Sequence, residues 1–196
     1  MITLGTHLFN MMRFFAGDVR WMTAHVTAEG RELEPAHVRD PSEPVGPVAG
    51  DCINAYYAFD SGVSGFFDSR KDQAGPNQRY GMEIIGSEAS LSLRGGSGSE
   101  LMLYPHPVFR PAADEQTWVP VTDLPDNELG LGNHLAIDDL IDAAEADREP
   151  ISSAAAAVAA LEMILGTYES QITGARVEMP MSNRQHPLAA FRGRSQ

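Results

Sequence analysis

The sequence predicts an α+β fold, an open and mainly antiparallel β-sheet with helices packed on one face. Apolar residues follow the 3.6-residue helical period over residues 5–17 and again over the last third of the chain. Between these segments the pattern changes to strand-like runs separated by short turns. The order of one helix, several hairpin strands and two helices is typical of an α+β domain. It does not fit alternating βαβ units.

The first helix is expected in GTHLFNMMRFFAG, residues 5–17, and should end at Gly17. Its apolar positions at i, i+3, i+4 and i+7, expected to face the core, are Leu8, Met11, Met12 and Phe15. His7 lies in the first turn, with Thr3 four residues before it and Asn10 three residues after it, so three polar side chains share one patch. An imidazole can move a proton near neutral pH when a hydroxyl reaches it. A hydrogen-bonded histidine at a helix start is the alternative, and spacing alone does not decide.

Strand patterns fill the middle of the chain. A strand over residues 18–27 is followed by a proline-punctuated loop over residues 29–50. Two strand-like runs flank Asp60–Gly62, which predicts a β-hairpin over residues 52–70. A second hairpin and two further strands are expected at residues 80–94, 100–105 and 117–122.

Two helices dominate the last third. One is expected over residues 134–146 with Asn133 as N-cap, and a second between a cap at Ser152 or Ser153 and Gly174. Their apolar faces are Ile137, Leu140, Ile141 and Ala144 in the first helix and Val158, Leu161, Leu165 and Tyr168 in the second. A short strand in ARVEMP should close one domain spanning residues 1–180. Residues 181–196 should form a tail on the surface.

Composition excludes several functional classes. The net charge of −13, from 27 acidic and 14 basic residues, disfavours nucleic acid as a partner. No run has the roughly 20 apolar residues of a membrane span. The single cysteine, Cys52, is expected to be buried and inert, which fits a reducing cytoplasm. His134 and Asp138, at i and i+4, could clamp a metal, but acidic residues in a first helical turn are the commoner explanation, so no metal is expected.

Five segments, in order, resemble the Gfo/Idh/MocA oxidoreductases (glucose-fructose oxidoreductase, inositol dehydrogenase and relatives). GTHLFNMMRFFAGDV is similar to the segment that carries Asp-x-Gly-x-His-x-x-Asp before a hydrophobic helix. GDCINAYYAFDSGVSGFFDSR resembles the central hairpin, and YGMEIIGSEASLSL resembles the following strand pair. The helix HLAIDDLIDAAEADREPISS and the ending ALEMILGTYESQITGARVEMP are similar to the C-terminal region. The resemblance covers nearly the whole chain.

This resemblance implies half of a two-domain enzyme. Family members join an N-terminal Rossmann domain that holds NAD or NADP to a C-terminal α+β domain, which builds the substrate pocket and an oligomer interface. The present sequence resembles only the second domain, so we expect no Rossmann domain in this chain. A lysine from the first domain, in a Glu-Lys-Pro motif, assists the family's chemistry. Lys71 is the only lysine here and has no such motif around it.

The resemblance assigns roles to six residues. His7 matches the catalytic histidine, which exchanges a proton with the reacting hydroxyl. Thr3 and Asn10 stand where the family has aspartates, and are expected to contact substrate without supplying a carboxylate. The strand-connecting loop at the family's substrate-facing end adds Arg70, Arg79 and Tyr80 as substrate contacts.

Two functions follow as expectations. The first is the substrate-binding and oligomerisation half of an NAD(P)-dependent dehydrogenase of a sugar, polyol or related hydroxy compound. It would be a homo-oligomer through its sheet, completed by a Rossmann domain that a separate chain could supply. The second is a non-catalytic binding or assembly module derived from that domain. The replacements at Thr3 and Asn10 favour the second reading mildly.

Overall fold

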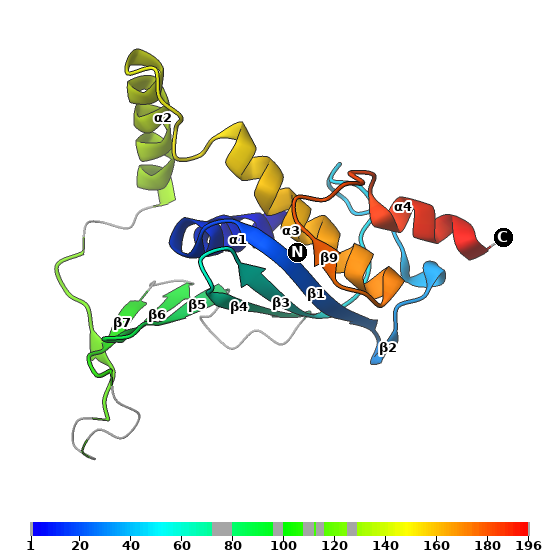
Figure 1. Ribbon diagram of the computed structural model, residues 1–196, viewed down its shortest axis with the longest axis horizontal. Helices are drawn as coiled ribbons and strands as arrows, with labels where there is room; N and C mark the ends of the chain where they lie inside the picture. Colours follow the sequence, from blue (N-terminus) through cyan, green and yellow to red (C-terminus); the bar gives the residue numbers. More distant parts are fainter. Residues whose placement is uncertain are drawn as a thin grey trace. The chain divides into compact units, whose positions relative to one another are not determined.

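A computed structural model describes residues 2–71, 80–95, 100–107, 112, 116–124 and 129–195 (Figure 1). The chain divides into two compact units, unit 1 with Met1–Lys71 and Glu149–Gln196, and unit 2 with Asp72–Arg148. The helices and strands of unit 1 are α1 (Ile2–Ala16), β1 (Val19–Ala28), β2 (Arg31–Glu32), the 3₁₀ helix η1 (Pro35–His37), β3 (Cys52–Phe59), β4 (Ser64–Arg70), α3 (Ala154–Thr173), β9 (Val177–Glu178), α4 (Pro187–Arg192) and the 3₁₀ helix η2 (Gly193–Ser195). Those of unit 2 are β5 (Tyr80–Ile85), β6 (Ser90–Gly95), β7 (Glu100–Tyr104), β8 (Val119–Pro120) and α2 (Leu129–Glu145).

The sheet of unit 1 has the order β2-β1-β3-β4, and β9 also pairs with β1. Every strand pair among the described residues is antiparallel. The hairpin predicted over residues 52–70 is confirmed, with Ala55 opposite Phe67 and a turn in which Gly62 takes a φ of 87°. Glycine adopts this left-handed conformation without the steric cost that a β-carbon adds.

One face of this sheet is covered by α1 and α3, which lie on the same side of it in Figure 1. Successive side chains of a strand point to opposite faces, so the alternate residues Ile53, Ala55, Tyr57 and Phe59 of β3 point toward the helices and are buried. The Tyr57 hydroxyl lies 3.0 Å from the Thr167 hydroxyl and donates to the Met163 carbonyl at 3.2 Å. The predicted α+β layering, an antiparallel sheet with helices on one face, is thereby confirmed.

The outer edge of β1 is closed by β9 and by side chains of α3. Beyond the short β9 pairing, the Ala24 N–H donates to Ser170 Oγ at 3.0 Å and the Val26 N–H donates to Gln171 Oε1 at 2.6 Å. The Gln171 side-chain amide in turn donates to Glu32 at 2.9 Å. Because an unpaired strand edge leaves polar backbone groups open to another chain, α3 protects this edge as well as the sheet face.

Unit 2 contains a sheet of order β5-β6-β7-β8 and the helix α2. The predicted second hairpin is confirmed, with the Gly86 N–H donating to the Ala89 carbonyl across its turn. In α2 all four residues of the predicted apolar face are exposed; these are Ile137, Leu140, Ile141 and Ala144. No helix in the described part of the chain is long and apolar enough to cross a bilayer.

The predicted apolar stripe of α1 is partly wrong. Phe15 is 58% exposed, whereas Phe9, which the prediction left out, is fully buried. Phe9 contacts Tyr57 and Phe67 with ring centroids 5.5 and 4.7 Å apart. Phe9, Met12 and Ala16 form a second apolar face of the helix, and it is this face that packs on the sheet.

The predicted start of α2 is wrong, whereas the predicted ends of α3 are confirmed. Asn133 is not an N-cap, because α2 already begins at Leu129. For α3, Ser153 is the N-cap through a hydrogen bond from the Ala156 N–H, and Gly174 ends the helix in the left-handed conformation. The predicted α3 row holds only in its second half, since Leu165 and Tyr168 are buried but Val158 and Leu161 are exposed.

Two further expectations about burial were wrong. Residues 181–196 do not lie wholly on the surface, because Met181 and Leu188 are buried and α4 packs on the core of unit 1. The Cys52 thiol is only half-buried, since it points to the face of the sheet that the helices leave uncovered. The local sequence around residues 181–196 and around Cys52 does not indicate their burial, because that burial depends on tertiary packing.

Candidate functional site

The helix α1 runs antiparallel to β4 across the covered face of the sheet. Its last residue accepts a hydrogen bond from Ser61, in the turn that precedes β4, whereas Phe9 contacts Phe67 further along that strand. Between them Met12 lies over Gly65, so close that a β-carbon there would be 2.6 Å from Met12 Cε. The helix begins at Ile2 and not near Gly5 as predicted, so His7 lies in its second turn, toward the end of the sheet at which β4 finishes.

His7 lies on the solvent-facing side of α1. Its side chain is exposed and makes no hydrogen bond or ion pair with any described residue. Asn10 is half-buried on the same side, and Phe14, one turn further, is 69% exposed. Thr3 belongs to the first turn of α1, but its side chain lies outside the described part of the structure. The structure thus presents the imidazole outward on a helix whose other face is anchored by buried aromatic rings.

The predicted substrate contact Arg70 is the last residue of β4. It follows Phe66 and Asp68 on the face of the sheet opposite α1, and its Nε donates to both carboxylate oxygens of Asp68 at 3.2 Å. Tyr80 begins β5 in unit 2, where its ring covers Gly95 of the neighbouring strand and remains partly exposed. Arg79 lies outside the described residues. Within unit 1, the structure brings His7 and Asn10 together on one side of α1 and places Arg70 on the other face of the sheet.

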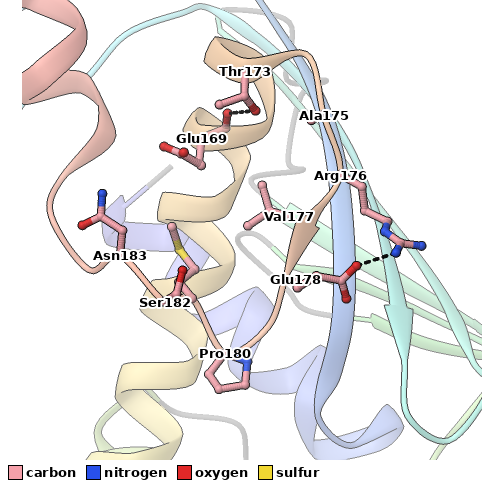
Figure 2. Close-up of a pocket in the computed structure, with 10 residues that line it drawn as sticks. Glu169, Thr173, Ala175, Arg176, Val177, Glu178, Pro180, Ser182 and Asn183 are labelled. Atoms are coloured by element: carbon pink, nitrogen blue, oxygen red, sulfur yellow. Dashed lines mark hydrogen bonds and ion pairs between the residues drawn. The ribbon is translucent and has the colours of Figure 1, made fainter.

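Unit 1 has two hollows, neither of them lined by the predicted site residues. The first, of about 390 Å³, lies between α3 and the segment of residues 175–183 (Figure 2). Figure 2 shows Val177 of β9 pointing toward α3, whereas Arg176 and Glu178 point the other way and pair with each other. The second, of about 400 Å³, lies between the first half of α3 and residues 180–184. No motif in the sequence marked either hollow.

Buried polar groups at the second hollow are used for packing. Glu162 is buried on α3, where one carboxylate oxygen pairs with Arg184 Nε at 2.9 Å. The other oxygen accepts from the Met181 N–H at 3.3 Å. These contacts hold the segment after β9 against α3. Among the described residues, no group of three His, Cys, Asp or Glu side chains is placed to hold a metal ion.

Fold and site together define a class of protein, a two-layer α+β domain that presents a histidine from a helix anchored on an antiparallel sheet. The family model described as "Oxidoreductase family, C-terminal alpha/beta domain", of the Gfo/Idh/MocA group, matches residues 1–179. The chain belongs to the Gfo/Idh/MocA oxidoreductase family and corresponds to its C-terminal domain. A search of curated proteins gives no match.

Solved structures share this fold. The NAD-binding oxidoreductase from Klebsiella pneumoniae matches 89% of this chain with a TM-score of 0.64 and 18% identity, over 48% of its own chain. Levoglucosan dehydrogenase in complex with NADH and L-sorbose matches 91% with a TM-score of 0.63 and 20% identity, over 49% of its chain. The aldose-aldose oxidoreductase from Caulobacter crescentus, complexed with glycerol, matches 89% with a TM-score of 0.61 and 17% identity, over 46% of its chain. The present chain spans about half the length of these structures.

Proposed function

We propose that this chain is the substrate-binding and oligomerisation half of an NAD(P)-dependent oxidoreductase that acts on a sugar, polyol or related hydroxy compound. The observation that carries the proposal is the exposed His7, held in the second turn of a helix that Phe9 anchors to the sheet. Family membership supports the reaction class. The names of the similar structures support the substrate class, because they include complexes with glycerol and with L-sorbose.

In this proposal His7 handles the proton of the reaction. Its neutral imidazole accepts the proton of a substrate hydroxyl as the carbonyl forms, and returns it in the opposite direction. The dinucleotide, when bound, takes up or supplies the hydride. Asn10, on the same side of α1, donates or accepts a hydrogen bond to a second hydroxyl but cannot act as a base. Thr3, Arg70, Arg79 and Tyr80 remain predicted substrate contacts.

The cofactor domain would cover the exposed side of α1. Proton and hydride leave the same substrate carbinol, so the dinucleotide must approach the side on which His7 stands. Phe14 and Phe15 are exposed beside it, with their rings in edge contact at 5.2 Å. Large exposed aromatic groups mark surfaces that a partner buries. We therefore place the Rossmann domain, supplied by another part of a longer protein or by a second chain, on these two side chains.

Homo-oligomerisation would use the uncovered face of the unit 1 sheet. Trp21, Tyr56 and Phe66 form a row of rings across three strands, with centroids 5.2 and 5.3 Å apart. Phe66 is 78% exposed. A row of this kind supplies the apolar centre that homodimer interfaces have. The half-exposed thiol of Cys52 lies on the same face and fits a reducing cytoplasm.

Titration with NADH tests whether cofactor binding requires a domain other than this one. The 196-residue chain alone is expected to leave NADH fluorescence unchanged, and saturable binding would overturn the proposal of a missing cofactor half. The coding DNA around this chain should then contain a glycine-rich βαβ region with Glu-Lys-Pro. With that domain present, His7→Gln should lower kcat by about 10²–10⁴-fold. His25→Gln, an exposed histidine of β1, is the matched control and should leave kcat unchanged.

A non-catalytic binding or assembly module is the second candidate. The observation that favours it is the neutral pair Thr3 and Asn10, which leaves the imidazole without a carboxylate one helical turn away. This reading predicts no cofactor-domain sequence nearby and no NADH binding in any assembly of the chain. Dehydrogenase activity that depends on His7 would exclude it.

A further inference from the structure

The C-terminal segment of residues 180–192, termed the clasp below, packs on the rest of unit 1. It contains a histidine, His186, whose surroundings are unusual. His186 precedes α4 and stacks its ring on Tyr168 of α3, with centroids 6.2 Å apart and planes 29° apart. The opposite wall is the loop at Gly46, where an added β-carbon would lie 3.0 Å from His186 Cδ2. Both ring nitrogens are shielded from solvent and neither has a hydrogen-bond partner. A buried polar atom without a partner is rare in folded proteins.

The rest of the clasp is held by ordinary contacts. Leu188 is fully buried in the core, and Arg192 pairs with both carboxylate oxygens of Asp40 at 3.0 and 3.3 Å. Nearer its start, the Glu162 carboxylate binds the Met181 N–H and Arg184. Part of the clasp also forms one wall of the hollow in Figure 2; its lining residues there are Pro180, Met181, Ser182 and Asn183.

The charged groups around His186 offer its ring no counter-ion. Tyr168, beside it, is neutral, and its hydroxyl donates to the Ala49 carbonyl at 3.4 Å. Arg39 is close enough to lower the pKa of Tyr168, although burial raises that pKa by more. Among the described carboxylates of the surrounding elements, Glu162 and Asp40 are engaged by arginines, and Glu43 of the Gly46 loop also has a partner of its own. An imidazolium at this position would have two N–H donors without an acceptor and a positive charge without a counter-ion.

We propose that the clasp is a pH-dependent latch, closed while His186 is neutral and released from α3 and the Gly46 loop when His186 is protonated. Burying the neutral ring leaves one N–H donor and one nitrogen acceptor without a hydrogen bond. Burying the protonated ring also removes a positive charge from water, which costs more free energy. Burial accordingly lowers the pKa of His186 below its ordinary 6.5. Because the folded pKa is the depressed one, the stabilisation is complete above pH 6.5 and declines as the pH falls toward the folded value. Release exposes Leu188 and removes one wall of the hollow.

Hydrogen exchange of α4 tests the latch on the full chain. After correction for intrinsic exchange rates, protection of the Leu188–Arg192 amides should be constant above pH 6.5 and fall below it, by up to about tenfold per pH unit until the pH reaches the folded pKa of His186, where the loss levels off. His186→Phe keeps a flat ring that cannot be protonated, and its protection should stay constant over the whole of this pH range. His134→Phe, at an exposed histidine of α2, should behave like the wild type.

Three results would overturn the proposal. Constant protection of α4 in the wild type would show that no latch exists. An identical loss in His186→Phe would show that another group is responsible for the pH dependence. If the His186→Phe chain fails to fold, the ¹H–¹³C resonance of the His186 ring in the wild type decides. A titration midpoint at or above 6.5 would contradict the burial on which the latch depends.

Discussion

Replacement of Phe9 by alanine tests whether α1 is held on the sheet as described. Full burial of a phenylalanine side chain stabilises a fold by about 1.5–3 kcal/mol. Each aromatic pair, here with Tyr57 and with Phe67, adds about 0.5–1.5 kcal/mol. These contributions sum to about 2.5–6 kcal/mol, a range that includes the usual cost of a buried Phe→Ala change, about 3–5 kcal/mol, which we take as the expected loss of unfolding free energy. In a chain of this length that corresponds to a fall in Tm of about 10 °C.

The same helix supplies the control. Phe14→Ala removes an identical side chain that is 69% exposed, so it should change stability by no more than about 0.5 kcal/mol. Urea titrations followed by circular dichroism, with unchanged m-values, measure both variants. Equal destabilisation by Phe9→Ala and Phe14→Ala would show that α1 does not rest on the sheet through Phe9. The placement of His7 at the end of β4 would then lose its support.

Three further predictions concern stability. Gly65→Ala should cost about 1–3 kcal/mol in thermal unfolding, because the added carbon would lie 2.6 Å from Met12 Cε of α1 and 2.8 Å from the buried ring of Phe59. An unchanged Tm would refute this close packing around Gly65. Ser153→Ala should cost about 1 kcal/mol through loss of the N-cap of α3, whereas Ser152→Ala should cost almost nothing, and equal losses would contradict the capping assignment. Burial raises the pKa of Tyr57 above its ordinary 10, so its contribution is complete below pH 10 and is lost as the pH rises further; Tyr57→Phe should flatten alkaline unfolding monitored by circular dichroism, and an unchanged alkaline limb would argue against this origin.

The features that the sequence predicted correctly are those that local chemistry decides. A glycine in the left-handed region closes the turn of residues 60–62, and another ends α3 at Gly174. A serine side chain caps α3 at Ser153, and the change of apolar period separates strands from helices. Each of these signals acts over a few residues, so it can be read without knowing the partner of the segment.

The choice of buried face could not be predicted in the same way. In α1 two apolar stripes overlap, one through Phe15 and one through Phe9, and only the shape of the sheet beneath selects the second. Gly65 provides the space that lets Met12 approach β4. Such complementarity joins residues more than 50 positions apart in the sequence, so no window of local periodicity contains it. The burial of Leu188 in α4 has the same origin.

For the candidate site, the sequence located the histidine but not its neighbours. An exposed His7 agrees with a position on the face of α1 away from the core. Arg70 was grouped with it by loop position, yet strand alternation from the buried Phe67 puts Arg70 on the other face of the sheet. The sequence shows that side chains of β4 alternate between the two faces of the sheet. Which of the two faces is buried depends on where α1 packs.

The charge of α1 is compatible with the nucleotide-bearing partner that the proposed function requires. The chain has 27 acidic residues, yet the 15 residues of α1 include none. Asp18, two residues after the helix, is paired with Arg13 of α1. A dinucleotide brings two negative phosphates, and like charges at close range raise the free energy of association. A neutral face with His7 and exposed phenylalanines avoids that repulsion while it offers apolar area to a covering domain.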